Sequence, residues 1–512
     1  MVVIYHYNSK VRQVTVDNQS IPFDSQRTIA DSLHALAQQF PDKNMVWCNI
    51  LAQEELNLEI IPFLFHHNKM MLSYSSATCN FFDSKIGYVE ESLFININKK
   101  VTFPTWQMSS LVGVISASFL NIVDEEVSKE ANFDYYLNAI AKLAMPKGLL
   151  CYSEPKLLKS EISVTSKKAS IFSLFRFVKQ YYKTRWVFLL FFNLMIYERK
   201  FPIFPMLFSL FYKNKKGLNI NLEPIKIQSS AQVINQMTID IIIPTIGRAH
   251  YLYDILCDLS KQTVLPHQII IVEQNPEIGS ESGLNYIYDE KWPFKIQHLF
   301  IHQAGACKAR NLALKGVESE WVFLADDDIR ISDNFIEKVF YGIRKLGANA
   351  VSVSCLQKIE RPTFNVRFQW GSFGSGCSIV KAEVLKNIRF NMAFEFGYGE
   401  DSDFGMQLRN QGHDVLYLPY PEIIHLKAPI GGFRTKPKLL WQEEAIQPKP
   451  SPTVMLYQII HNSKEQILGY KTVLFFKYYK HQNIKNPYRY FICFQKQWQR
   501  SVYWAHQLKL KS

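Results

Sequence analysis

The chain has 512 residues, of which 47% are hydrophobic and 20% charged, with a formal net charge of +13 and a pI near 9.1. This composition excludes an intrinsically disordered protein and predicts two or three globular domains. The positive charge favours an anionic partner, and composition leaves open whether that partner is nucleic acid, an acidic membrane surface or a phosphorylated substrate.

The eight cysteines are scattered without CxxC or Cys/His spacing, which argues against a zinc site and against a disulfide framework. The amino terminus, MVVIYHYNSKVRQV, lacks the apolar region of a secretory signal. No segment has the roughly 20 uninterrupted apolar residues of a membrane-spanning helix. These features predict a cytoplasmic protein.

Residues 1–160 have a pattern typical of an α/β domain, and parts of this segment resemble a later part of the chain. TIADSLHALAQQFPDKNMVWCNI parallels YLYDILCDLSKQTVLPHQIIIVEQ, and NFDYYLNAIAKLAMPKGLLCYSEP parallels EDSDFGMQLRNQGHDVLYLPYPE. Matching Gly148 to Gly412 puts Tyr136 and Leu137 where the later segment has its Glu-Asp pair. The segment is therefore either a degenerate repeat that has lost these acids or an unrelated α/β domain.

Residues 161–235 are predicted to form a basic, aromatic linker. Its apolar run from Trp186 to Tyr197 is too short to span a bilayer, but it suits a helix in the membrane interface with basic flanks. The alternative is that these residues pack between two domains. Residues 433–512 are predicted to be a basic, aromatic helical region, and this interleaving also raises a nucleic-acid-binding protein as a lower-ranked alternative.

Residues 236–432 alternate strands and helices, which predicts right-handed βαβ units and a parallel sheet. The first strand, Ile239 to Ile243, stops at Pro244, and a second strand ends at Glu273.

The segment WVFLADDDI sets Asp326, Asp327 and Asp328 at the tip of a buried strand. Open α/β sheets bind ligands at the carboxyl ends of their strands. Carboxylates there can hold a hard divalent cation that in turn binds a diphosphate. The alternative is a solvated turn that caps the following helix.

Four segments in order, IIIPTIGR, IIIVEQNP, GACKARNLAL through FLADDDI, and GYGEDSDFGMQLRNQGH, resemble the family 2 glycosyltransferases over residues 239–425. The resemblance implies a GT-A fold, with a mixed, mainly parallel sheet and helices on both faces. It also implies inverting transfer of a sugar from a nucleotide diphosphate donor. The predicted fold is thus an α/β GT-A domain preceded by a second α/β domain, the candidate degenerate repeat.

The resemblance also implies roles for particular residues. The donor's nucleotide and sugar would be bound by Pro244, Thr245, Arg248, Glu273, Arg310, Asn311, Asp326 and Asp327, although the family more often has Asp at the position of Glu273. A Mn²⁺ or Mg²⁺ ion would be held by Asp326, Asp328 and His425. A histidine after an apolar strand is equally a hydrogen-bonded core residue.

In the segment GYGEDSDFG, the resemblance makes Asp401 the base that takes the proton of the acceptor hydroxyl, with Glu400 binding a sugar. Asp403 is expected to cap or orient the helix that follows. The glycines of WGSFGSGCSIV would allow the backbone to approach the sugar.

The main hypothesis from the sequence is an inverting, metal-dependent glycosyltransferase in surface glycan or glycolipid assembly. It would act on a glycan or lipid-linked acceptor, peripherally at the inner face of the membrane, without binding nucleic acid. Its first rival is a catalytically inert, sugar-nucleotide-binding scaffold subunit. Intact acids at 326, 328, 400 and 401 argue against the rival.

Overall fold

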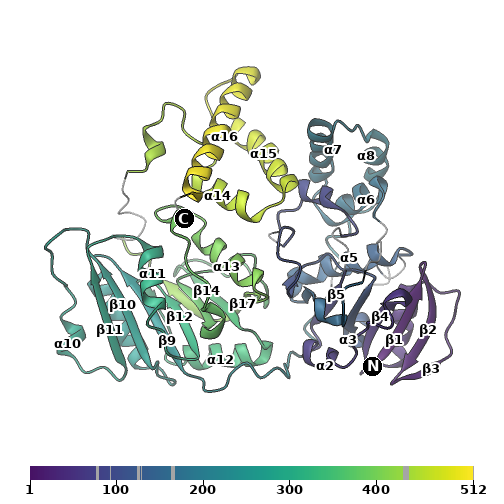
Figure 1. The fold of residues 1–512 in the computed structure, drawn as a ribbon, viewed down its shortest axis with the longest axis horizontal. Coiled ribbons are helices and arrows are strands. Elements are labelled where there is room, and N and C mark those ends of the chain that lie inside the picture. The colour runs from purple at the N-terminus through teal and green to yellow at the C-terminus, as the bar shows by residue number, and fades with distance from the viewer. Residues whose placement is uncertain are drawn as a thin grey trace. The chain divides into compact units, whose positions relative to one another are not determined.

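The computed structural model describes residues 1–75, 80–92, 94–123, 127, 130–162, 168–218, 220–429 and 438–510. The chain forms two compact units (Figure 1). Unit 1 contains residues 1–231 and 462–483, and unit 2 contains residues 232–461 and 484–512. The domain boundary expected at residue 432 lies outside the described residues.

Unit 2 is an α/β unit followed by helices. Its strands are β9 (Ile239–Thr245), β10 (Gln268–Gln274), β11 (Lys295–Ile301), β12 (Trp321–Ala325), β13 (Ile329–Arg330), β14 (Ala350–Leu356), β15 (Phe368–Gln369), β16 (Cys377–Lys381) and β17 (Leu416–His425). Its helices are α9 (Ala249–Ser260), α10 (Tyr286–Asp289), α11 (Ala306–Leu314), α12 (Phe335–Leu346), α13 (Glu400–Asn410), α14 (Pro452–His461) and α16 (Pro487–Lys509).

The unit 2 sheet has the order β11-β10-β9-β12-β16-β14-β17-β13, with β15 paired to β17. Strands β11, β10, β9 and β12 are mutually parallel, β16 is antiparallel to both of its neighbours, and β14 is parallel to β17. This is the mixed, mainly parallel sheet that the GT-A resemblance implied, so the predicted fold class is confirmed.

The central strands are mostly apolar because helices cover both faces of the sheet. Side chains alternate between the faces. Ile242 and Leu324 share a core cluster with residues of α11 and α13. Phe323 points to the other face and packs against Phe335 of α12, with the two ring centroids 5.5 Å apart. With its sides covered, the sheet presents the carboxyl ends of β9 and β12 to a ligand.

Unit 1 contains a second α/β sheet and a group of helices. Its strands are β1 (Val2–Tyr7), β2 (Lys10–Val16), β3 (Gln19–Ile21), β4 (Asn44–Asn49), β5 (Met70–Tyr74), β6 (Phe103–Pro104), β7 (Val112–Ser116) and β8 (Leu150–Ser153). Its helices are α1 (Ile29–Gln39), α2 (Ile61–Leu64), α3 (Ala117–Leu120), α5 (Phe133–Ala144), α6 (Ile171–Tyr181), α7 (Arg185–Glu198), α8 (Ile203–Leu210) and α15 (Lys464–Tyr479).

The unit 1 sheet has the order β3-β2-β1-β4-β7-β5-β8-β6. From β1 onward it repeats the unit 2 sheet: β1, β4, β7, β5, β8 and β6 have the same neighbours and directions as β9, β12, β16, β14, β17 and β15. The corresponding strands also follow one another in the same sequence order. Beyond β1, however, the antiparallel hairpin β2–β3 takes the place of the parallel strands β10 and β11.

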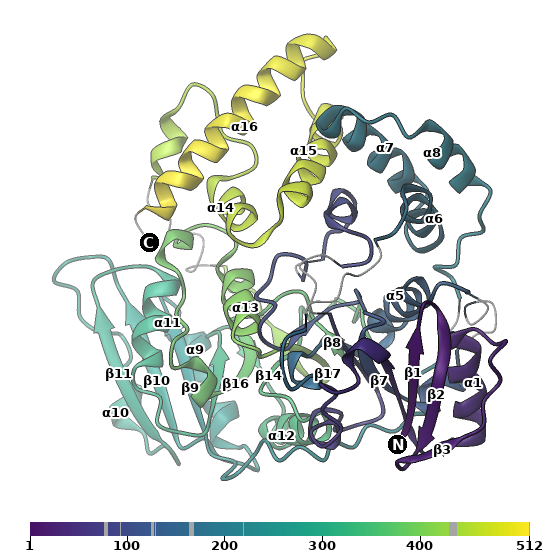
Figure 2. The same ribbon diagram turned by 45° about the vertical axis from the view of Figure 1, so that its right-hand side comes forward.

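Much of the segment expected as a linker forms the helices α6, α7 and α8, which lie side by side in unit 1 (Figure 2). Phe175 and Phe177 of α6 and Leu190 of α7 belong to the unit 1 core. Within the described residues, no helix is long and apolar enough to cross a membrane.

Candidate active site

A cleft of about 450 Å³ opens at the carboxyl ends of β9 and β12 in unit 2. The predicted residues that line it are Pro244, Thr245, Arg248, Arg310, Asp326, Asp327, Asp328, Glu400, Asp401 and His425. They come together because parallel strands end at one edge of the sheet and the start of α13 returns to it. The volume lies within the range of small-molecule sites.

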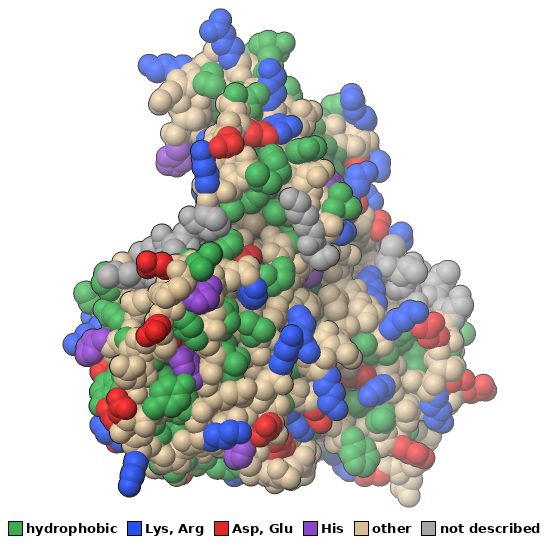
Figure 3. All heavy atoms as spheres, turned by 60° about the vertical axis from the view of Figure 1, so that its left-hand side comes forward, with side chains coloured by type: hydrophobic (Ala, Val, Ile, Leu, Met, Phe, Trp, Pro, Cys, Tyr) green, Lys and Arg blue, Asp and Glu red, His purple; other side chains and the backbone are tan. Residues whose placement is uncertain are grey.

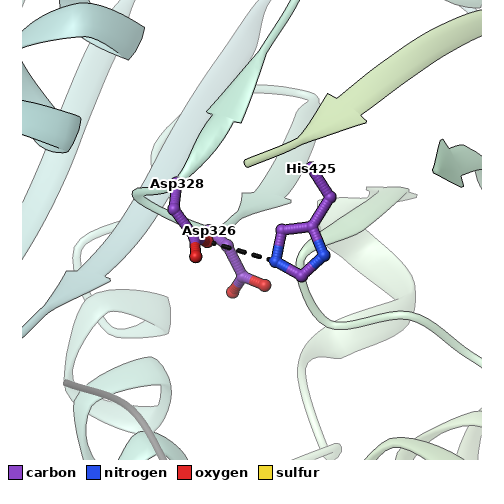
Figure 4. A group of neighbouring side chains, drawn as sticks. All are labelled: Asp326, Asp328 and His425. Atoms are coloured by element: carbon purple, nitrogen blue, oxygen red, sulfur yellow. Dashed lines mark ion pairs between the residues drawn. The ribbon is translucent and has the colours of Figure 1, made fainter. Parts of the chain in front are cut away.

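Asp326, Asp328 and His425 form a candidate metal centre (Figure 4). One ligand atom from each of the three lies within 4.8 Å of the others. The antiparallel pairing of Ile329 with His425 brings the end of β17 to the aspartates. Two carboxylates and an imidazole form a donor set that fits Mn²⁺ or Mg²⁺.

Within this centre, Asp328 and His425 also interact directly. His425 Nε2 lies 3.4 Å from Asp328 Oδ1, and the backbone N–H of Ala428 donates to Asp328 Oδ2 at 2.8 Å. Burial raises the pKa of Asp328, but these hydrogen bonds and Arg248 outweigh it and hold the pKa below its usual value. Asp328 is therefore an anion at neutral pH, as a metal ligand must be.

Asp327 lies beneath the cleft and is 3% exposed. It accepts hydrogen bonds from Thr245 Oγ1 and Arg248 Nη1, both at 2.7 Å. Burial raises the pKa of Asp327 to about 6 in spite of Arg248. In this structure, Asp327 holds Thr245 and Arg248 in place at the donor side of the cleft.

Arg310 sits on α11 beneath Asp326. Its Nη2 donates to Asp326 Oδ1 at 2.9 Å, and its guanidinium lies 5.5 Å from the centre of the Phe390 ring. On the other side of Asp326, a Cβ added at Gly376 would lie 2.1 Å from Asp326 Oδ2. Asp326 is thus confined between an arginine and a glycine backbone.

Glu400 and Asp401 begin helix α13 and face the cleft. Burial, together with the charge of Asp401, raises the pKa of Glu400 to about 7. Burial also raises the pKa of Asp401, although Arg310 and hydrogen bonds from the hydroxyl and backbone N–H of Ser375 act in the opposite direction. Asp401 Oδ1 is buried and has no hydrogen-bond partner among the described residues.

Two of the predicted donor-binding residues lie outside the lining of the cleft. Glu273 accepts hydrogen bonds from Ser282 Oγ at 2.5 Å and from the N–H of Gly283 at 3.2 Å, and His298 Nε2 lies 2.9 Å from it. Asn311 exchanges two 2.8 Å hydrogen bonds with the backbone of Phe390. The structure therefore gives both residues partners within unit 2.

Asp403, expected to cap or orient its helix, lies in the first turn of α13. Its Oδ1 is 2.7 Å from His461 Nε2 on α14, and its Oδ2 accepts from Gln407 at 2.7 Å. The acid thus ties the helix that carries Asp401 to a helix 50 residues further along the chain.

Three further residues of the lining were not predicted: Gln274, Glu395 and Lys427. Glu395 accepts from the N–H groups of Cys307 and Lys308 at the start of α11, at 3.2 and 2.9 Å. For Lys427, the one available signal in the sequence was its position two residues beyond the metal-ligand candidate His425. Gln274 and Glu395 are recognisable as lining residues only from the fold.

A second cavity, of about 470 Å³, lies at the opposite end of β12. Three of its charged side chains have partners within unit 2: Lys381 pairs with Glu383 at 3.1 Å, and Glu320 accepts from the backbone N–H groups of residues 235–237. None of the predicted site residues lines this cavity.

Residues 240–402 match the family described as glycosyl transferase family 2. A curated relative, the "Uncharacterized glycosyltransferase YwdF" of Bacillus subtilis (strain 168), is 33% identical over 103 residues. That match covers 20% of this chain and 37% of the relative. The chain thus spans little more than a third of the length of that relative.

Among solved structures, TarS 1–349 of S. aureus in complex with UDP-GlcNAc aligns with a TM-score of 0.35 and 18% identity. The alignment covers 46% of this chain and 70% of that one. GalNAc-T7 with UDP, GalNAc and Mn²⁺ aligns with a TM-score of 0.34 and 12% identity, over 44% of this chain and 48% of that one.

Proposed function

We propose that the protein is an inverting, metal-dependent glycosyltransferase that moves a sugar from a nucleotide diphosphate donor to a hydroxyl of a glycan or lipid-linked acceptor. Residues 236–432 would be its catalytic domain. One observation carries the proposal: a single cleft holds a three-residue metal-ligand set and, facing it, the buried and unpaired carboxylate oxygen of Asp401.

The metal centre would hold Mn²⁺ or Mg²⁺ through Asp326, Asp328 and His425. A divalent cation bound there offsets the charge that develops on the leaving diphosphate, as a Lewis acid. The residues around it set the position of the ligands. Arg310 and Gly376 confine Asp326, and the N–H of Ala428 orients Asp328.

Asp401 would act as the base. Inverting transfer requires an acceptor hydroxyl to attack from the side opposite the leaving group while a carboxylate takes its proton. The unpaired Oδ1 of Asp401 is an acceptor that such a hydroxyl would satisfy. Because burial raises its pKa, the carboxylate is a stronger base than a solvated aspartate. Glu400, beside it, would bind a sugar hydroxyl.

The experiment that tests the donor site is calorimetric titration of UDP, GDP and dTDP into the full chain, with and without Mn²⁺. We expect one nucleotide to bind in a metal-dependent manner, and the binding to be lost in the Asp326→Ala, Asp328→Ala double variant. Asp333→Ala is the matched control, because that aspartate is exposed and lies outside the cleft. Absence of binding by all three nucleotides would refute the donor site.

Turnover separates the enzyme from an inert scaffold. If a nucleotide binds with metal, the corresponding sugar nucleotide should be consumed by the wild type and not by Asp401→Asn, and proton NMR of the new anomeric centre reports inversion. Metal-dependent binding with no turnover, tested against lipid-linked and soluble glycan acceptors, would favour the scaffold.

The proposal includes association with an anionic membrane surface through α7 and α8. Within α7, Leu190 and Leu194 are buried, but α8 and the residues around it leave aromatic side chains exposed, with Phe204 at 74%, Phe208 at 61% and Phe211 at 88%. Exposed basic residues flank these helices: Lys183, Arg185, Arg199, Lys200, Lys213 and Lys216. Apolar side chains bracketed by lysine and arginine suit an anionic lipid interface.

On the face in Figure 3, which brings the β10–β11 side of unit 2 forward, basic and acidic side chains are interspersed.

The membrane surface is tested by flotation with phosphatidylglycerol-containing and pure phosphatidylcholine vesicles. The full chain should float with the anionic vesicles at low salt, and Phe204→Glu with Phe208→Glu should abolish this. Phe63→Glu is the control, because Phe63 is 77% exposed on α2, outside this group of helices. If the wild type stays in the soluble fraction, or if the control loses binding equally, the surface is not α8.

A further inference from the structure

The repeated sheets place a carboxylate of unit 1 in the position of the proposed base. Helix α5 lies between β7 and β8 as α13 lies between β16 and β17. Asp134 is the second residue of α5, and Asp401 is the second residue of α13. The alignment through Gly148 had put Tyr136 and Leu137 in this position. That alignment is displaced because unit 1 has an additional turn, Met145–Lys147, between the helix and the glycine.

Asp134 has the same kind of partner as Asp401. Its Oδ1 accepts from the backbone N–H of Ser110 at 2.8 Å, and the Ser110 hydroxyl also hydrogen-bonds to it. Ser110 lies two residues before β7, as Ser375 lies two residues before β16. Like Asp401, Asp134 is partly exposed. The aspartate–serine pair therefore recurs at equivalent positions of the two sheets.

The donor side of the site does not recur. The register that pairs Ala325 with Cys377 in unit 2 pairs Cys48 with Val112 in unit 1, so residues 49–51 stand where residues 326–328 stand. These are Asn, Ile and Leu in place of three aspartates. The hairpin β2–β3 also replaces the strands next to β9. At residues 49–51, unit 1 thus has no acid that would hold a metal and a diphosphate.

What unit 1 has in place of the acids is apolar and accessible. Leu51 is 57% exposed and Ile50 is 39% exposed, and the backbone N–H of the preceding Asn49 donates to Leu111 O, next to Ser110. Ile50 and Leu51 thus follow the strand that is hydrogen-bonded beside the Asp134–Ser110 pair. Exposed aliphatic side chains and a carboxylate are the two kinds of group that suit a sugar ring, which presents C–H groups on its faces and hydroxyls on its rim.

A second polar group adjoins the pair. Asn138, one turn along α5, is 1% exposed and donates to the backbone oxygens of Met108 and Asp134. Its own Oδ1 is buried without a hydrogen-bond partner among the described residues. Such a group costs roughly 1–3 kcal/mol unless it is paired. A water bound beside this oxygen would pair it.

We propose that unit 1 contains a saccharide-binding site, built on Asp134, Ser110 and the exposed Ile50 and Leu51, that binds a neutral glycan without metal or nucleotide. It is the acceptor half of a GT-A site whose donor half has been lost. That the bound glycan is the acceptor, or the growing product, rests on the proposed function. The binding itself does not.

The test uses the full chain on an array of immobilised microbial glycans in the presence of EDTA, with ligand-observed NMR of the best glycan in solution. We expect at least one neutral glycan to bind, with its affinity unchanged in the Asp326→Ala, Asp328→Ala variant and reduced at least tenfold in Asp134→Asn. Nucleotide titration of Asp134→Asn should match the wild type, so failure here and failure of the donor site are distinguishable.

A second variant guards against misfolding of Asp134→Asn. Leu51→Asp changes an exposed side chain, so it should leave thermal unfolding unchanged and still reduce glycan binding at least tenfold. Phe63→Asp, also at an exposed side chain, should change neither thermal unfolding nor glycan binding. The inference is overturned if no glycan binds, if Leu51→Asp and Asp134→Asn bind like the wild type, or if binding is lost in the donor-site variant.

Discussion

Substituting Gly376 by Ala is a sharp test of the metal centre, because it adds one methyl group against one ligand. The new Cβ would lie 2.1 Å from Asp326 Oδ2 and 2.4 Å from its Cγ, where ordinary contact begins at 3.4 Å. Gly376 has no positive φ, so alanine introduces no backbone strain there. The Asp326 carboxylate is therefore the group that must move.

The displacement can be compared with what a metal site tolerates. Restoring contact requires Asp326 to retreat by more than 1 Å, whereas metal–ligand distances hold within about 0.2 Å. The movement also breaks the 2.9 Å hydrogen bond from Arg310. A misplacement of about 1 Å costs on the order of 100-fold in rate. We expect a loss of about that size in turnover and at least tenfold weaker Mn²⁺-dependent nucleotide binding.

The assay is calorimetric titration of the nucleotide with Mn²⁺, followed by steady-state turnover. Gly283→Ala is the control, because no atom lies within 4 Å of its added Cβ and its φ is not positive. Thermal unfolding of both variants checks the fold. Wild-type Mn²⁺ affinity in Gly376→Ala, or an equal loss in Gly283→Ala, would refute the placement of Asp326 in the metal centre.

Three further predictions follow from the charges of unit 2. Asp401→Asn should reduce kcat by about 10²- to 10⁴-fold with nucleotide affinity unchanged, because it removes only the base; an equal fall in affinity would contradict this role. The folded-state pKa of Glu400, about 7, lies above its ordinary 4.5, so the folded protein binds more protons and its stability should fall as pH rises from about 4.5 to 7. Denaturant unfolding at pH 5 and pH 8 should show this fall in the wild type and a smaller one in Glu400→Gln. His461→Ala should destabilise unit 2 by about 3 kcal/mol, because it removes the imidazole partner of the buried Asp403; denaturation midpoints unchanged from the wild type would show that the pair contributes little.

The sequence alone predicted those features that depend on local pattern. The apolar runs ending at Ile243 and Leu324 were recognisable as strands of a parallel sheet, and acids that follow such a strand must lie at the ligand-binding edge of the sheet. The resemblance then brought His425 into the same site from nearly 100 residues away. The structure places its imidazole beside Asp328.

Other features required the tertiary structure because they depend on contacts between distant segments. Nothing local marks Glu395 as the carboxylate that meets the start of α11, or Gly376 as the residue that leaves room for Asp326. The repeat shows the same limit. The similar order of helix and strand suggested the repeat, but the alignment through Gly148 missed Asp134. The added turn Met145–Lys147 lies between the helix and that glycine, so it displaces the match of every residue in the helix.

The sequence by itself determined three things: the class of domain, the order in which the motifs follow the strands, and the acids available for chemistry. These depend on periodicity and composition, which act within a few residues of the chain. Only the tertiary structure decided which acids remain charged, which are paired and which stay unpaired. Burial, hydrogen bonding and charge proximity are set by the segments that pack around a side chain, and these come from anywhere in the sequence.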